Sequence, residues 1–378
     1  MRINYLLLFV VGFLFMSHQT EAQWSDETMT HDDVERTYKI YIPSTYDESE
    51  PAALVLTLHG LGDNINNFSQ IGFAPIADTA NFILVVPQAL ADPMMGTAWN
   101  SGAGMMGFFP NSTVDDIGFL NALVDHTLAN YSVDADKVYI CGYSMGAFMT
   151  QRMACESHGR FAAFGSVAGT RGSALTSCNP NVAMPVVHFH GTSDGTVGYT
   201  GNTFGMDVDP LISFWINNNQ TDETPIHTAL PDVATDGYTI DHYLYTNGNA
   251  DVELFKVNNA DHVWLRKPAN DISYTEELWK FFRKHEGAVN INEVNSNASL
   301  NVYPNPATDV LNIDINNIEI SKTYTISLFD IKGSLVYQGK GQGNQVQINL
   351  GQTSIHHGMY LLKINNEEFH ITQKVVIN

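Results

Sequence analysis

The stretch KVYICGYSMGAFM, residues 137–149, decides the fold of this chain. Its first residues are apolar and predict a buried strand, its centre matches Gly-x-Ser-x-Gly, and its last residues favour a helix. A serine between a strand and a helix N-terminus lies on a strained turn with its Oγ exposed. Gly142 and Gly146 keep that turn free of Cβ atoms. We therefore interpret Ser144 as a candidate nucleophile; the alternative is a glycine-rich turn with an incidental serine.

Apolar runs alternate with helical patterns on both sides of this stretch, between residues 35 and 290. Such runs, separated by helices, are typical of a mostly parallel sheet that is covered on both faces. We predict a doubly wound α/β domain over residues 23–286, with reactive groups at the carboxyl ends of its strands. Strands are expected at residues 36–42, 53–58, 82–87, 138–141, 186–190 and 252–258, and helices at 117–131, 146–157 and 274–285.

The N-terminus predicts export. A short basic segment, residues 1–4, precedes the apolar run at residues 5–16, and Ala22 offers a small residue for cleavage. This pattern indicates a signal peptide over residues 1–22, because the run is too short to span a bilayer as a stable helix. A retained membrane anchor is the alternative. We expect the mature protein to have no membrane span.

Composition narrows the class of protein further. The chain has 378 residues, of which 44% are hydrophobic, enough for two domains. Its formal net charge of −22 argues against nucleic acid or an anionic membrane as a partner. Among the three cysteines, Cys141 is expected to be a buried thiol, whereas Cys155 and Cys178 can pair in an oxidising compartment. Their spacing predicts no metal site.

The character of the sequence changes after residue 286. Residues 287–298 are rich in asparagine and predict a linker, and residues 299–378 contain short alternating segments that predict a small all-β sandwich. The segments at residues 302–307 (VYPNPA), 328–333 (LFDIKG), 358–360 (GMY) and 374–376 (KVV) resemble the C-terminal sorting domain of the Bacteroidetes type IX secretion system. The resemblance implies a secretion machinery as partner and a secreted or cell-surface protein. The alternative is an accessory module that binds carbohydrate.

A serine nucleophile needs a base that removes its proton and a carboxylate that orients the base. In α/β-hydrolases these follow the serine in the order acid, then histidine. Asp194 follows the predicted strand at residues 186–190 directly, so its carboxylate is expected at the carboxyl end of the sheet. Asp207 and Asp209 are rivals, but neither of them follows a buried strand.

The candidate base is His262, in the loop after the strand at residues 252–258. His242 lies within a strand-like stretch and His285 ends a helix, so both fit less well. The backbone N–H groups of Met145 and Leu61 are the expected oxyanion donors, since one follows the nucleophile and the other follows an early strand. His59 and His190 each precede a glycine at a strand end, and we interpret both as structural.

Residues 35–285 resemble the esterase family of poly(3-hydroxybutyrate) depolymerases and of carbohydrate-esterase family 1 feruloyl and acetylxylan esterases. The matching segments are residues 58–63 (LHGLGD), 98–100 (AWN), 114–119 (VDDIGF), 138–147, 161–169 and 190–194. The resemblance implies an α/β-hydrolase fold, the triad Ser144, Asp194 and His262, and no cofactor. It implies a serine ester hydrolase that acts on plant polysaccharide, with a polyester hydrolase as the alternative. Asp261 departs from the glycine that usually precedes the histidine.

The loop at residues 94–110 is expected to lie over the candidate active site. Methionines and aromatic residues among its glycines are typical of adaptable apolar binding surfaces. We predict that Trp99, Met105 and Phe108 contact the acyl group of a polymeric ester; the alternative is a loop that caps the core. The hypothesis from another class of function is a non-catalytic carbohydrate-binding surface protein.

Overall fold

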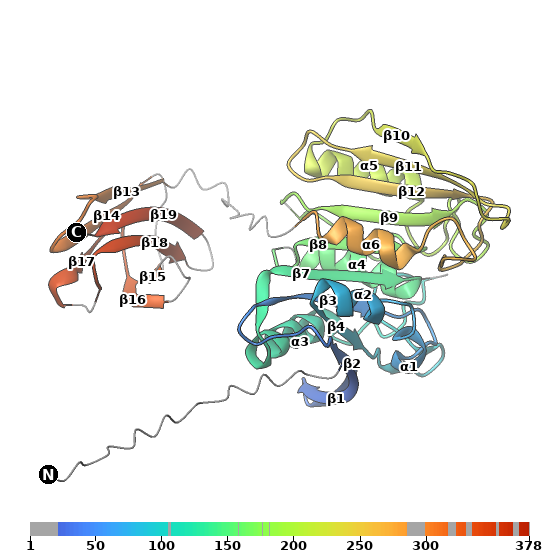
Figure 1. Cartoon of the computed structure of the whole chain (residues 1–378), viewed down its shortest axis with the longest axis horizontal. Coiled ribbons are helices and arrows are strands. Elements are labelled where there is room, and N and C mark those ends of the chain that lie inside the picture. The colour runs from blue at the N-terminus through green and yellow to red at the C-terminus, as the bar shows by residue number, and fades with distance from the viewer. Residues whose placement is uncertain are drawn as a thin grey trace, which may run out of the picture. The chain divides into compact units, whose positions relative to one another are not determined.

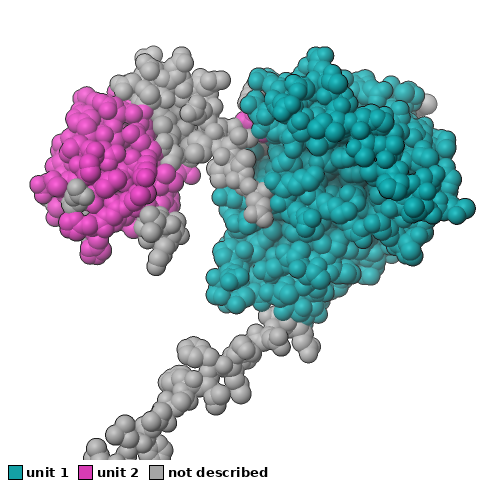
Figure 2. Space-filling model, turned by 45° about the horizontal axis from the view of Figure 1, so that its top comes forward, with its two compact units in different colours: residues 1–180, 184–286 teal, residues 181–183, 287–378 magenta. Residues whose placement is uncertain are grey.

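The computed structural model describes residues 22–104, 107–157, 159–175, 177–180, 182–285, 299–316, 323–329, 335–352, 355–365 and 370–377. The chain divides into two compact units, residues 1–180 with 184–286, and residues 181–183 with 287–378 (Figure 2). The predicted signal peptide, apart from its last residue, and the predicted linker at residues 287–298 lie outside the described residues. Among the described helices, none is both long and apolar enough to cross a membrane.

The first unit is built on a ten-stranded sheet (Figure 1). Its six central strands are parallel, and two strands at each edge run antiparallel to their neighbours. In spatial order the strands are β1 (Gln23–His31), β2 (Val34–Ile42), β4 (Phe82–Pro87), β3 (Ala52–Leu58), β7 (Val133–Tyr143), β8 (Ala163–Val167), β9 (Val186–Gly191), β12 (Val252–Asn258), β11 (Thr239–Tyr245) and β10 (Ile226–Ala229). A short hairpin, β5 (Ala91–Asp92) with β6 (Gly96–Thr97), lies outside this sheet.

Helices cover both faces of the sheet, which confirms the doubly wound α/β architecture (Figure 1). Helices α2 (Ala74–Ala80) and α6 (Tyr274–Phe282) pack on one face, within one hydrophobic cluster. Helices α3 (Asp116–Asn130), α4 (Met145–Glu156) and α5 (Val208–Asn219) cover the other face, and the short α1 (Ile65–Phe68) follows β3. Every residue of β3, β4 and β9 is buried, as expected of strands that are covered on both faces.

The second unit is all-β, as predicted. One sheet contains β13 (Ser299–Tyr303), β14 (Val310–Asn316) and β17 (Gln345–Asn349), and the other contains β16 (Leu335–Gly341), β15 (Tyr324–Phe329), β18 (Gly358–Asn365) and β19 (His370–Ile377). A 3₁₀ turn, η1, spans Leu350–Gln352. Buried residues of both sheets form one hydrophobic cluster, so the unit is a sandwich with its own core.

The three cysteines adopt the expected states. Cys155, at the end of α4, forms a disulfide with Cys178 in the following loop. Cys141 is a buried free thiol in β7, and burial raises its pKa.

Candidate active site

Ser144 lies on the turn between β7 and α4 with a φ of 53° and a ψ of −119°. A non-glycine residue adopts such a conformation only where the surroundings enforce it. A Cβ on Gly142 would overlap the backbone of Gly146, and a Cβ on Gly146 would overlap the backbone of Leu58. The two glycines therefore allow the close packing of strand and helix that the sequence motif predicted.

Asp194 and His262 come together at the carboxyl end of the sheet. Asp194 follows β9, His262 follows β12, and the His262 Nδ1 lies 2.7 Å from the Asp194 Oδ2. The other oxygen, Oδ1, accepts hydrogen bonds from the backbone N–H groups of Thr196 at 2.9 Å and Val197 at 2.7 Å. Burial by itself raises the pKa of Asp194, but hydrogen bonds from His190 and His262 outweigh it and hold the pKa below its usual value.

Ser144 and His262 line the same cavity, which has a volume of about 330 Å³. Met145 and Leu61 also line it, so both predicted oxyanion donors belong to residues at this cavity. Met145 is the first residue of α4, where a backbone N–H has no partner within the helix. The arrangement places a half-buried serine, an imidazole held by a carboxylate, and a helix N-terminus around one apolar space.

The loop that carries Leu61 is held by the side chain of His59. The His59 Nδ1 donates to the carbonyl of Gly60 at 2.7 Å, and its Nε2 accepts from the backbone N–H of Ala89 at 3.1 Å. His59 is fully buried and its pKa is lowered by desolvation. The neutral ring therefore braces the loop, which matches the structural role predicted for it.

Comparisons with known proteins find a match for each of the two units. Residues 45–227 match the phospholipase/carboxylesterase family, and residues 301–378 match the secretion system C-terminal sorting domain. The first unit has the α/β-hydrolase fold. The all-β unit is similar to a secretion sorting domain.

Similar proteins include three curated enzymes. A bifunctional acetylxylan esterase/xylanase from Neocallimastix patriciarum is 27% identical over 43% of this chain and 22% of its own length. Poly(3-hydroxyalkanoate) depolymerase C from Paucimonas lemoignei is 28% identical, covering 59% of this chain and 57% of that protein. Feruloyl esterase B from Piromyces equi is 26% identical, covering 59% of this chain and 42% of that protein. The chain thus spans less than two thirds of the length of each of these relatives.

Among solved structures, the acetyl xylan esterase from Aspergillus awamori superimposes with a TM-score of 0.49 at 16% sequence identity. The superposition covers 69% of this chain and 99% of that one.

One side of the α/β-hydrolase cavity is apolar. Ala103, Phe148 and Val197 form a small buried cluster against which Phe204 packs, and all four line the cavity. The sequence analysis did not single out these residues. Phe148 lies on the first turns of α4, so the nucleophile motif could have indicated it, whereas Phe204 lies in a loop without a recognisable pattern.

The prediction that Trp99 contacts the acyl group is not supported by its position. Trp99 is fully buried, and its Nε1 donates to the carbonyl of His59 at 2.9 Å. The indole therefore supports the His59 loop from beneath, because its N–H finds its partner there and not at the cavity. Phe108 is 38% exposed and does not line this cavity, and Met105 lies outside the described residues. Of the 94–110 loop, Ala103 reaches the cavity.

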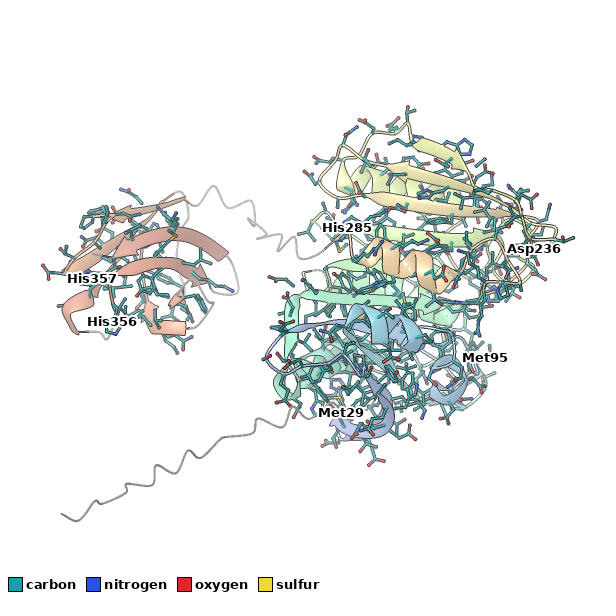
Figure 3. The ribbon with its side chains drawn as sticks, in the orientation of Figure 1. Met29, Met95, Asp236, His285, His356 and His357 are labelled. Carbon is teal, nitrogen blue, oxygen red and sulfur yellow. A yellow bond between two sulfur atoms is a disulfide. The ribbon has the colours of Figure 1, made fainter. Side chains whose placement is uncertain are left out.

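The rival residues lie in other surroundings. Asp207 accepts from the backbone of Asn202, and Asp209 accepts from the Tyr199 hydroxyl. His242 pairs with Glu253 at 2.9 Å, and His285 follows α6 (Figure 3). Asp194 and His262 fit the site better than these rivals, because they contact each other and His262 lines the same cavity as Ser144.

Proposed function

We propose that the first unit is a secreted serine ester hydrolase with Ser144 as nucleophile, His262 as general base and Asp194 as its orienting carboxylate. The observation that carries this proposal is the 2.7 Å contact between His262 Nδ1 and Asp194 Oδ2 in a cavity shared with Ser144. A carboxylate on Nδ1 leaves Nε2 as the nitrogen that accepts the serine proton.

The proposed reaction proceeds through an acyl-enzyme. The Ser144 Oγ attacks the ester carbonyl while its proton passes to His262, and Asp194 stabilises the imidazolium that forms. The N–H groups of Met145 and Leu61 stabilise the oxyanion of the tetrahedral intermediate. His262 then protonates the leaving alcohol, and water activated by the same imidazole releases the acid.

The cavity favours an apolar acyl group, and the net charge of the chain favours a neutral polymer. Phe148, Phe204 and Val197 offer apolar contacts for an acyl chain or ring. The net charge of −22 opposes the approach of polyanionic substrates. Feruloylated or acetylated plant polysaccharide meets both conditions and is our first candidate. A polyester is the second, favoured by the likeness to a poly(3-hydroxyalkanoate) depolymerase.

The proposal is tested by turnover of p-nitrophenyl acetate. We expect Ser144→Ala to lose activity by orders of magnitude, as nucleophile variants do. Ser213→Ala is the matched control, because Ser213 is exposed on α5 and its hydroxyl donates to the carbonyl of Asp209, one turn earlier in the same helix. Equal rates for the wild type and Ser144→Ala would refute the hydrolase and favour a non-catalytic binding protein.

The substrate class is tested by a product assay over methyl ferulate, acetylated xylan, poly(3-hydroxybutyrate) and an aromatic polyester. We expect release of ferulate, because the Phe148 side of the cavity suits a ring. Release of acetate alone would exclude an aromatic acyl pocket. The sorting domain supports a further part of the proposal, that the enzyme acts outside the cell or on its surface.

A further inference from the structure

Two histidines lie behind the candidate acid, deep in the first unit. His188 and His190 alternate along β9 and therefore share one face of the sheet. Both are buried, with 0% and 1% of their surface exposed. Buried titratable side chains of this kind need hydrogen-bond partners, and here every ring nitrogen has one.

These partners form a continuous chain that ends at Asp194. The Trp215 Nε1 donates to Gln151 Oε1 at 2.9 Å, and Gln151 Nε2 donates to Ser166 Oγ at 2.9 Å. Ser166 Oγ lies 2.7 Å from His188 Nδ1, and His188 Nε2 lies 3.0 Å from His190 Nδ1. The members come from α5, α4, β8 and β9, so the chain crosses the layer between the sheet and its helices.

The direction of every bond follows from the last one. The His190 Nε2 lies 2.8 Å from the carbonyl of Val197, which can only accept, so Nε2 carries the hydrogen. In a neutral ring His190 Nδ1 then accepts from His188 Nε2, and His188 Nδ1 accepts from the Ser166 hydroxyl. Desolvation, and then the neighbouring His190, lowers the pKa of His188 well below its usual value, which agrees with a neutral His188 ring.

The last member of this hydrogen-bonded network, His190, restrains both oxygens of the Asp194 carboxylate, one directly and the other through Val197. His190 Nε2 lies 3.4 Å from Asp194 Oδ2, the oxygen that contacts His262. The carbonyl of Val197 is fixed by His190, and the N–H of the same residue donates to Asp194 Oδ1 at 2.7 Å. Rotation of the carboxylate would break contacts on both sides.

We propose that His190, held in its Nε2–H tautomer by His188, is a positioning residue that orients Asp194 toward His262. This role rests on the proposed hydrolase function. An apolar ring at position 190 would fill the same space but would release Val197 and Asp194. The candidate base would then face a carboxylate with rotational freedom, and displacements of about 1 Å at such groups cost on the order of 100-fold in rate.

The kinetic test compares His190→Phe with His190→Gln, whose amide N–H can replace the Nε2 donor. We expect His190→Phe to lower kcat about 10- to 100-fold with KM within about twofold, and His190→Gln to recover most of the loss. His242→Phe is the control, because His242 is also a strand histidine bonded to a carboxylate, but that of Glu253. If folded His190→Phe has the kcat of the wild type, the positioning role is overturned. If the activity still depends on Ser144, the hydrolase proposal is unaffected by that result.

A second measurement reports on the wild-type protein and does not depend on turnover. Nitrogen-15 NMR of labelled histidines, assigned with His188→Gln and His190→Gln, reports the tautomer of each ring. We expect Nε2–H for His188 and His190 and Nδ1–H for His262 at neutral pH. An imidazolium or an Nδ1–H tautomer at His190 would overturn the inference even if no ester is hydrolysed. If the tautomers are as expected but no Ser144-dependent turnover is found, only the hydrolase proposal is refuted.

Discussion

Asp261 Oδ1 accepts a hydrogen bond from the backbone N–H of Gly195 at 2.9 Å and so joins the loop of the candidate base to the loop of the candidate acid. The same oxygen accepts from the N–H of His262 at 2.8 Å. The glycine that usually precedes the histidine in the family this chain resembles has no side chain for either bond. The departure noted in the sequence thus has a structural consequence, because one carboxylate fixes the spacing of Asp194 and His262.

We predict that Asp261→Gly lowers kcat of ester hydrolysis about tenfold and leaves KM nearly unchanged, because the two loops lose their common acceptor. Asp261→Asn keeps an oxygen at this position and should retain most of the activity. The comparison is made with p-nitrophenyl acetate under saturating conditions. Equal losses in the two variants would show that the negative charge matters and that the bridge does not.

Trp99 gives a prediction for the oxyanion loop. Trp99→Phe removes the N–H that donates to the His59 carbonyl and leaves that buried acceptor without its partner. We expect a loss of about 1–3 kcal/mol in the free energy of unfolding and a lower kcat, because Leu61 is carried by the same loop.

The control for this prediction is Trp279→Phe, which removes a partly buried indole that packs against Phe82, on the side of α6. It should lower stability and leave kcat unchanged. Urea unfolding and steady-state kinetics on both variants separate the two effects. Unchanged kcat in Trp99→Phe would assign the indole to the core alone.

The apolar side of the cavity gives a prediction on specificity. Ala103→Phe places a ring beside Phe148 and Phe204 and reduces the space for an acyl group. We expect kcat/KM for methyl ferulate to fall at least about tenfold, while p-nitrophenyl acetate, with its small acyl group, is affected less. Kinetics with both esters measure the ratio. An equal decrease for both would place the acyl group elsewhere.

The disulfide gives a prediction on stability. Cys155 and Cys178 are separated by 23 residues, and a loop of this size contributes roughly 3 kcal/mol by restricting the unfolded chain. Cys155→Ser/Cys178→Ser should therefore unfold at lower urea concentration, and reductant should have the same effect on the wild type only. Cys141 is an internal control, since its buried thiol should react with iodoacetamide only on unfolding.

The sequence predicted those parts of the fold that local patterns encode. The apolar runs of β3, β4 and β9 and the glycines around Ser144 are local, and all were placed correctly. The strands β1 and β10 were not predicted, because their exposed and half-exposed residues do not form a continuous apolar run. Helix α5 was also not predicted, although Asp207 at its N-cap and Asp209 in its first turn are residue types that favour a helix start.

The positions of site residues could be predicted where the order of strands along the chain determines which residues lie near each other. Asp194 and His262 follow parallel strands, and the carboxyl ends of such strands meet at one edge. Trp99 was assigned to the acyl pocket because the composition of its loop indicates an apolar surface. Composition does not show which of these side chains is buried in the core, as Trp99 is. The alternation of His188 and His190 along β9 is visible in the sequence, but their hydrogen-bonded partners on α4, α5 and β8 are distant along the chain, so no local pattern could reveal that network.

His285 gives the last prediction, on stability against acid. Its ring is partly buried beside Phe281, and desolvation lowers its pKa from 6.5 to about 4. Between these two values the unfolded chain binds a proton that the folded chain does not, so stability falls as the pH falls through this window. The contribution is about 3 kcal/mol at most. His285→Leu should therefore lose less stability between pH 7 and pH 4.5 than the wild type does, as measured by urea midpoints, whereas the same change at exposed His126 should not reduce the loss. An equal acid-induced loss in wild type and His285→Leu would mean that His285 is protonated in the folded protein as readily as in the unfolded chain.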